Sequence, residues 1–435
     1  MPGLRYFPRQ LALFSAICAL SPFARAQAPD VAAQTELIQQ LLKRIDRLEN
    51  RVTELESERS GSLAEKKPSA AADPSATAAP LAPATIAGMG TAGHDHGTPL
   101  EPTSTYPSLR LSGFGDINYV ASDQPGTHTG FNEGQFILHM SSALSSRVTY
   151  FGELSMTART DAGSGSPAAG GFNLEVERSM IRFDQSDHLK VSFGRYHTPI
   201  SYWNTAFHHG SWLQTTASRP EMIQFGGSFI PVHFVGTLAE GSFSAKGLNL
   251  NYNAGIGNGR SSVLSRSGDW GDVNNNKAWL ANVFVKPDKL YGLQVGAAVY
   301  RDKINATGRP EAREWIQSAH LVWSKENPES IAEFFNVNHR RPGSNVAVNS
   351  QAWYAQMAWR LPFAAQWKPY YRYDYIHVPM ADLVFRGAIS NLAGSTLGVR
   401  YDISNFSAFK LEYRRQSRPG LADINVAWVQ TSFTF

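Results

Sequence analysis

Apolar and polar residues alternate along the chain from Leu109 to its end, in segments of about ten residues. The segment 367–375 shows the pattern most clearly. One of its faces carries aromatic residues, Trp367, Tyr371, Tyr373 and Tyr375, and the other carries mainly polar ones, Lys368, Tyr370, Arg372 and Asp374. Successive side chains of a strand point to opposite faces, so this period of two predicts β-strands.

Clusters of Gly, Asn, Asp, Ser and Pro interrupt the alternation, and the interruptions are alternately short and long. Seven short and eight long connections join sixteen strands. Residues 108–435 then provide about 20 residues for each strand with its connection, which suits tilted membrane-spanning strands. We therefore expect an all-β fold, a 16-stranded antiparallel transmembrane β-barrel. Eighteen strands remain possible, because the segment 221–242 could form one long arm or two short ones.

The composition supports a barrel that faces lipid outside and water inside. Charged residues make up 17% of the chain and aromatic residues 11%, and the mean hydropathy is −0.28. After the first thirty residues no apolar run is long enough for a membrane-spanning helix. The net charge of +4 is too small to indicate nucleic acid as a partner. Only a closed sheet would pair every backbone group of such a chain in hydrocarbon.

Residues 1–26 have the zones of a secretory signal peptide in the expected order. Arg5 and Arg9 precede an apolar stretch, and Ala24-Arg25-Ala26 provides a cleavage site. The alternatives are a buried N-terminal helix and a lipoprotein that uses Cys18 as its acceptor. Cleavage would remove Cys18, the one cysteine of the chain, which excludes disulfides and cysteine chemistry from the mature protein.

A heptad pattern in residues 31–59 predicts a periplasmic coiled coil, whose core residues are Ile38, Leu41, Ile45, Leu48, Val52 and Leu55. β-Branched residues at a with leucine at d favour two strands. Two segments, Arg44-Ile45-x-x-Leu48-Glu49 and Arg51-Val52-x-x-Leu55-Glu56, resemble instead the pattern of short trimeric coiled coils and favour a trimer. A single amphipathic helix packed on another domain is a third possibility. Residues 60–107 are rich in Ala and Pro and predict a linker. We expect the His94-Asp95-His96 turn in this linker to be solvated.

The third long connection, 197–220, is too long and too aromatic for an exposed loop tip. A sixteen-stranded barrel is too wide for its wall side chains to fill, so a further segment of the chain must narrow the interior. We expect this loop to fold inward and constrict the pore with His197, Tyr202, Trp203, His208, His209, Trp212 and Arg219. A basic lumen wall is expected from Arg110, Lys190, Arg340, Arg360, Lys368, Arg372, Arg400, Lys410 and Arg414. Acidic residues partly offset this wall, so a weak preference for small anions, together with passage of neutral solutes, is predicted.

The chain ends with alternating aromatic residues, and Phe433 and Phe435 are typical of the signal read by the outer-membrane assembly machinery. No Gly-x-Ser-x-Gly motif is present, and no spacing selects a serine, histidine and acid for catalysis. We therefore expect neither enzymatic activity, nor a cofactor, nor a bound metal ion.

After its strand, the sequence Gly194-Arg195-Tyr196-His197-Thr198-Pro199 resembles an element of the phosphate-selective porin O/P family. The resemblance implies a trimeric, sixteen-stranded channel for small solutes. The segment 197–220 contains one arginine and no lysine, unlike the dense basic ladder of that family, so phosphate selectivity is not carried over.

Two functions are therefore expected of the exported chain. The first is a homotrimeric porin in the outer membrane of a Gram-negative cell, in contact with its lipids, through which small hydrophilic solutes diffuse passively. The alternative is an envelope-tethering protein whose coiled coil links the outer membrane to the cell wall, with peptidoglycan as its partner.

Overall fold

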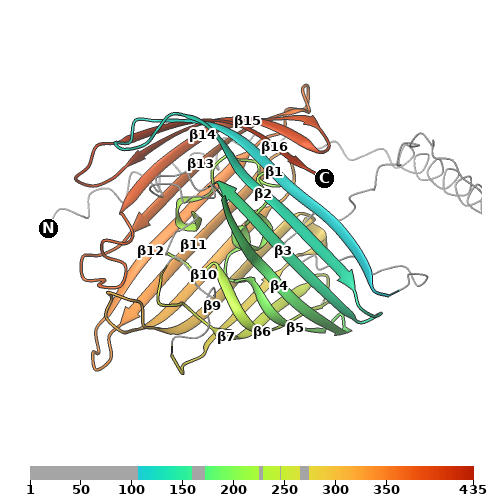
Figure 1. The fold of residues 1–435 in the computed structure, drawn as a ribbon, viewed down its shortest axis with the longest axis vertical. Helices are drawn as coiled ribbons and strands as arrows, with labels where there is room; N and C mark the ends of the chain where they lie inside the picture. Colours follow the sequence, from blue (N-terminus) through green and yellow to red (C-terminus); the bar gives the residue numbers. More distant parts are fainter. Residues whose placement is uncertain (1–105, 159–171, 225–228, 245, 265–273) are drawn as a thin grey trace, which may run out of the picture. The chain divides into compact units, whose positions relative to one another are not determined.

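The computed structural model describes residues 106–158, 172–224, 229–244, 246–264 and 274–435, which form sixteen antiparallel strands. Each strand pairs with the next along the chain, and β16 pairs with β1, so the sheet closes on itself (Figure 1). The predicted barrel is confirmed, with sixteen strands and not eighteen. The predicted signal peptide, the coiled coil and the linker up to residue 105 lie outside the described residues.

The strands lie beside one another in chain order. They are β1 (Ser108–Ser122), β2 (Gly130–Ala143), β3 (Val148–Ala158), β4 (Phe172–Ser186), β5 (Leu189–His197), β6 (His233–Phe243), β7 (Leu250–Asn258), β8 (Ala278–Val285), β9 (Leu293–Ile304), β10 (Ala312–Trp323), β11 (Glu329–Arg340), β12 (Ala347–Ala358), β13 (Trp367–His377), β14 (Leu392–Ser404), β15 (Ser407–Ser417) and β16 (Ile424–Thr434).

The seven predicted short connections all lie at one end of the barrel, here called the short-turn end, and the long ones lie at the other, the long-loop end. Phe435 also lies at the short-turn end, where its carbonyl accepts a hydrogen bond from Gly113 N at 2.9 Å. Its ring stacks on Phe136. The role of Phe433 and Phe435 in assembly stays a prediction.

The connection between β5 and β6 is longer than the predicted 197–220, because it continues to residue 232. Pro220 is followed by the short 3-10 helix η1 (Glu221–Ile223), and β6 begins only after Pro231. A proline cannot donate to a sheet ladder, which explains why strand pairing does not start earlier. We call residues 198–232 the third loop.

The two faces of the wall differ as the alternation predicts. In β13, Lys368 and Arg372 are buried inside the barrel, while Trp367 and Tyr371 are exposed on its outer face. The buried apolar residues form a cluster around the third loop, with Trp203, Phe234, Tyr300, Phe335, Tyr354 and Phe385 among its members. The hydrophobic core of this protein therefore lies between the inner wall and the chain that folds against it.

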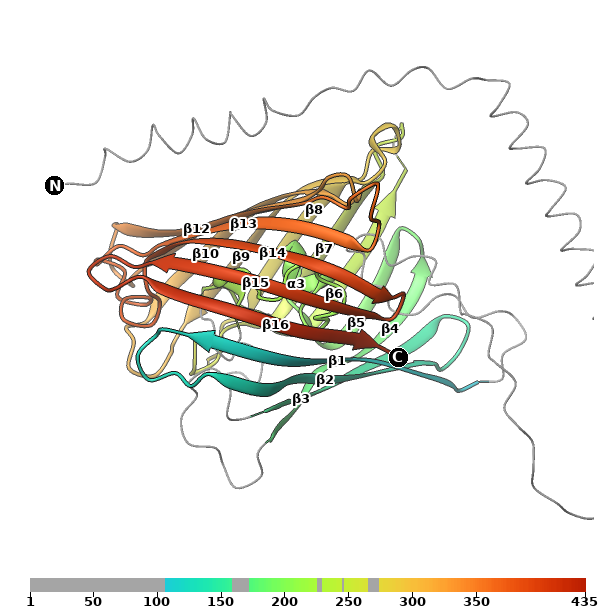
Figure 2. The same cartoon turned by 90° about the horizontal axis from the view of Figure 1, so that it is seen from above.

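The third loop also contains α3 (Tyr202–Ala206), which lies among the strands in Figure 2. The 3-10 helix η2 (Asp288–Leu290) lies in a short turn. No helix in the described ranges is long and apolar enough to span a membrane.

Candidate functional site: the third loop and the inner wall

The first part of the third loop is fixed by a carboxylate of the wall at the start of α3. Glu333 of β11 accepts hydrogen bonds from the backbone N–H groups of Tyr202 (2.7 Å) and Trp203 (3.0 Å). Ser201 Oγ and Tyr354 Oη donate to the same carboxylate at 3.2 and 2.8 Å. The first N–H groups of a helix have no partner within the helix, so a buried carboxylate at this position satisfies them.

The two ends of the loop are joined to each other. Asn204 Nδ2 donates to the carbonyls of Thr198 (3.2 Å) and Val232 (2.8 Å), and Thr198 N donates to Val232 O at 3.0 Å. Ser318 Oγ of β10 donates to Ile200 O at 2.7 Å. The loop therefore leaves and re-enters the wall at one place, and the chain between these points folds across the interior.

The second part of the loop is held by charged side chains of the opposite strands. Arg372 of β13 is fully buried and donates to the carbonyls of Ser218 and Arg219, both at 2.8 Å, and to Asp374 at 2.8 Å. Glu412 of β15 accepts from Ser218 N at 3.2 Å. A buried charge is tolerated only with such partners, so these groups specify where the loop lies.

Other cations of the wall bind the loop backbone in the same way. Lys410 donates to Thr216 O at 3.0 Å, and Arg400 donates to Trp212 O at 2.6 Å. Arg414 forms an ion pair with Glu221 of the loop. The positive charge of the wall is therefore used largely to hold the loop in the lumen.

Eight of the nine predicted wall residues lie on the inner face of the barrel or at its rim. They are Arg110, Lys190, Arg360, Lys368, Arg372, Arg400, Lys410 and Arg414. The prediction for Arg340 is wrong, because Glu333 and His339 of β11 are buried inside and Arg340 falls on the other face. The inner face of β11 also carries Phe335 and Val337, which pack under the inserted chain. In β11 an apolar side chain is therefore no sign that a position faces the lipid.

The seven residues predicted to constrict the pore lie in the third loop or, for His197, at the end of β5. Most of them are buried, and Trp203 has no exposed surface. Its ring lies edge-on against Phe207 and Tyr354. These side chains therefore attach the loop to the wall, and the constriction itself must be formed by the loop as a whole.

Four histidines and one glutamate come together where the loop meets β4, β5 and β6. Glu177, His197, His208, His209 and His233 are all buried, and each offers one ligand atom within 4.8 Å of the others. Burial lowers the pKa of His208 well below its usual value, so its ring is neutral at neutral pH. We call these five residues the histidine cluster.

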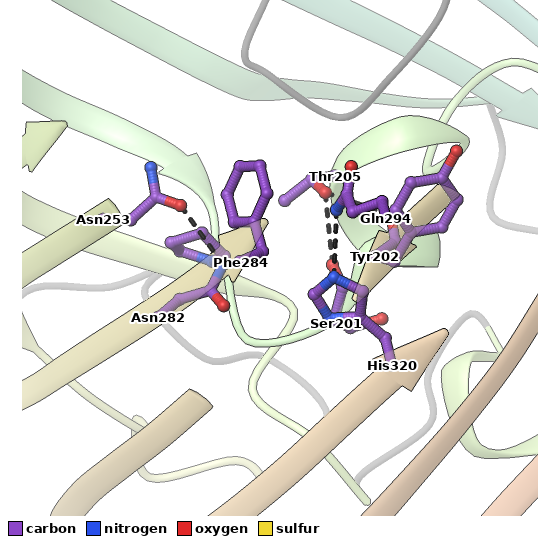
Figure 3. Close-up of a pocket in the computed structure, with 9 residues that line it drawn as sticks. Ser201, Tyr202, Thr205, Asn253, Asn282, Phe284, Gln294 and His320 are labelled. Atoms are coloured by element: carbon purple, nitrogen blue, oxygen red, sulfur yellow. Dashed lines mark hydrogen bonds between the residues drawn. The ribbon is translucent and has the colours of Figure 1, made fainter. Parts of the chain in front are cut away.

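Sequence reasoning missed several of these groups. Glu177, His233 and Glu333 carry no motif, and they meet the loop only because the barrel closes. Below α3 the structure also forms a small polar pocket between the helix and β7 to β10 (Figure 3). Its lining includes Asn253, Asn282, Gln294 and His320. Alternating polar positions in four neighbouring strands were the available signal for this pocket.

Several solved structures share this fold at low sequence identity. An anion-selective porin from Comamonas acidovorans is 12% identical, with a TM-score of 0.55, and the match covers 76% of this chain and 100% of that one. OmpF of Salmonella typhi, in complex with daunomycin, is 13% identical, with a TM-score of 0.53 and coverage of 75% and 97%. The trimer form of OmpT, an outer membrane protein of Vibrio cholerae, is 13% identical, with a TM-score of 0.51 and coverage of 76% and 99%.

No protein-family model matches the chain, and no curated protein matches it significantly. At these identities the structural likeness concerns the fold alone. The described residues therefore have the fold of the outer-membrane porins.

Proposed function

We propose that this protein is an outer-membrane porin, a water-filled channel for the passive diffusion of small hydrophilic solutes. One observation carries the proposal: a loop held by buried hydrogen bonds folds across the inside of a closed sixteen-stranded barrel. A barrel of this size is too wide to be filled by its own wall side chains, and an inserted loop sets the size of the opening.

The outer surface of the barrel supports a membrane location. Exposed aliphatic and aromatic side chains cover the outward positions of the strands, including Leu174, Phe193, Leu397, Leu411 and Tyr413. Near the short-turn end, Tyr291, Trp359 and Trp367 are exposed, as expected for an aromatic girdle. We place the short-turn end in the periplasm and the long-loop end outside the cell. The trimer form of one structural neighbour supports a homotrimer.

The pairing of the wall charges supports a weak preference for anions. Arg372, Arg400 and Arg414 each contact a carboxylate of the wall or the loop, so most of their charge is balanced. Lys410 is fully buried against the loop, where it donates to loop carbonyls. The chain has 40 basic and 36 acidic residues, so a small positive excess remains. The remaining positive charge favours anions without binding them tightly.

The first residue of the element that resembles the phosphate-selective porin O/P family has a structural requirement of its own. Gly194, the first residue of the resembling element, has a φ of +139°, and a Cβ there would lie 2.1 Å from Ser179 O. Only glycine fits such a position. The element therefore has a defined backbone role at the point where β5 leads into the third loop.

Planar-bilayer recording tests the proposed function. Purified folded protein should add conductance in groups of three equal steps, and a salt gradient should give a reversal potential of the sign expected for a slight excess of anion current. Folded protein that inserts and never conducts would reject the porin, and single-sized independent steps would reject the trimer.

The envelope-tethering function stays a prediction, because the coiled coil on which it rests lies outside the described residues. Deleting residues 31–107 should then detach the envelope. Cells whose envelope stays intact after this deletion would count against tethering.

A further inference from the structure

The histidine cluster is assembled from three strands and one loop. Glu177 lies in β4, His197 at the end of β5, His233 at the start of β6, and His208 and His209 lie in the third loop. Each of the five residues is 3 to 6% exposed. The ring centroids of His197 and His208 are 4.2 Å apart, and those of His208 and His209 are 4.3 Å apart. Packing of the loop against the wall does not by itself require four imidazoles at such short distances.

The hydrogen bonds around the cluster orient two of its histidines. His233 Nδ1 faces the guanidinium of Arg195 at 3.0 Å, and because arginine only donates, this nitrogen accepts. The proton of a neutral His233 then lies on Nε2, which donates to Glu177 at 2.7 Å. His209 Nδ1 bonds with Gln135 at 3.0 Å, which turns His209 Nε2 toward Glu177.

The remaining distances suit a small cation with tetrahedral coordination. Metal–ligand bonds of about 2.0 to 2.2 Å place neighbouring ligand atoms of a tetrahedron roughly 3.3 Å apart. His209 Nε2 and Glu177 Oε2 are already 3.2 Å apart. Among the described residues, His197 Nε2 has no hydrogen-bond partner, although it is buried within the same cluster.

We propose that Glu177, His197, His208 and His209 bind one divalent transition-metal ion of the zinc class. Three imidazoles and one carboxylate form the ligand set that Zn²⁺ and Co²⁺ accept and that Mg²⁺ and Ca²⁺ do not favour. His233 holds the ligating carboxylate and Gln135 holds the ring of His209, as outer partners do in metal sites.

The surrounding charges limit the affinity without excluding the ion. Arg195 lies near Glu177 at 3.8 Å, and Arg178 is paired with Glu153. The site supplies only one carboxylate, so the bound ion keeps a net positive charge near these arginines, which lowers its affinity. The bound ion would join β4 and β5 to the third loop, and it would stabilise the loop in its inserted position.

The test uses the full chain, purified without a polyhistidine tag and freed of metal with a chelator that is then removed. Calorimetric titration with Zn²⁺ should give one equivalent per chain. Co²⁺ should give the visible absorption of a tetrahedral complex. The variant H208Q/H209Q should lose both signals. Q135L, which keeps every ligand, should bind Zn²⁺ about 10- to 100-fold more weakly.

The control variant is H94N/H96N, because His94-Asp95-His96 is the other place in the sequence where histidines cluster. This variant should keep the equivalent of Zn²⁺ and the Co²⁺ spectrum. Heat-dependent migration on a gel reports whether each variant is a folded barrel. No binding to folded wild-type protein, loss of the signals in H94N/H96N, or full affinity in folded Q135L and H208Q/H209Q would overturn the proposal. Conductance of metal-free protein is measured separately, so a failed metal site leaves the porin proposal standing.

Discussion

The third loop is held at two regions of the wall that use opposite chemistry. At β4 to β6 the loop is packed through the histidine cluster, whose loop member His208 is neutral. At β13 to β15 it is held by charged side chains that bind loop backbone atoms directly. Four of these are Arg372, Arg400, Lys410 and Glu412. We call the second region the charged anchor.

This difference indicates which part of the loop the fold alone holds in place. Arg372 and Glu412 each have several partners, so releasing the loop there would leave buried charged groups with fewer hydrogen bonds. The ring of His208 is neutral, so moving it leaves no unpaired charge behind, and imidazole lone pairs can accept a metal ion. We therefore expect the charged anchor to be permanent and the histidine cluster to be adjustable.

The largest effect is expected from breaking the charged anchor. R372M removes a fully buried guanidinium that donates to Asp374 and to two loop carbonyls, which should destabilise the barrel by about 3–5 kcal/mol. Urea unfolding followed by gel migration measures the change. R415M removes an exposed ion pair with Asp423 and should leave the unfolding curve unchanged. Equal unfolding curves for the two variants would show that the anchor contributes nothing.

A smaller effect is expected at the start of α3. E333Q keeps the size of the side chain, but it replaces one accepting oxygen by a donor that faces backbone N–H groups. The lost hydrogen bonds should cost about 1–3 kcal/mol in the same unfolding measurement. The variant should also show noisier single-channel currents, since α3 is less firmly held. A quiet channel with wild-type stability would contradict the role assigned to Glu333.

The effect at Ser318 should be smaller still. S318A removes one neutral hydrogen bond to Ile200 O, which should cost about 1 kcal/mol. The same unfolding assay detects a change of this size only if the loop and barrel unfold together. No shift in S318A would indicate that the loop detaches before the barrel unfolds.

The smallest effect is expected on ion selectivity. It distinguishes charges on the inner face of the wall from charges on its outer face. K190Q and R340Q each remove one positive charge, but Lys190 shares the inner face with Ser192, whereas Arg340 lies outside. The reversal potential in a salt gradient should move slightly toward cations in K190Q and stay unchanged in R340Q. A larger shift of the reversal potential in R340Q would show that the side chain of Arg340 faces the lumen.

The barrel could be predicted because alternation and turn residues are local signals. The contacts of the third loop could not, since Trp203 meets Glu333 and Ser218 meets Arg372 across more than a hundred residues. Alternation assigns a side chain to a face without naming its partner. For Arg340 the sequence did not identify even the face correctly. The inner face of β11 packs against inserted chain and is therefore apolar, like the outer face.

The single-channel conductance of a variant without residues 200–212, compared with wild type in the same bilayer, shows whether the third loop controls the passage of solutes. The deletion removes α3 and both loop histidines and leaves all sixteen strands intact. If the third loop narrows the channel, the conductance of each subunit should rise clearly. An unchanged or lower conductance from a folded variant would mean that this loop does not control the passage.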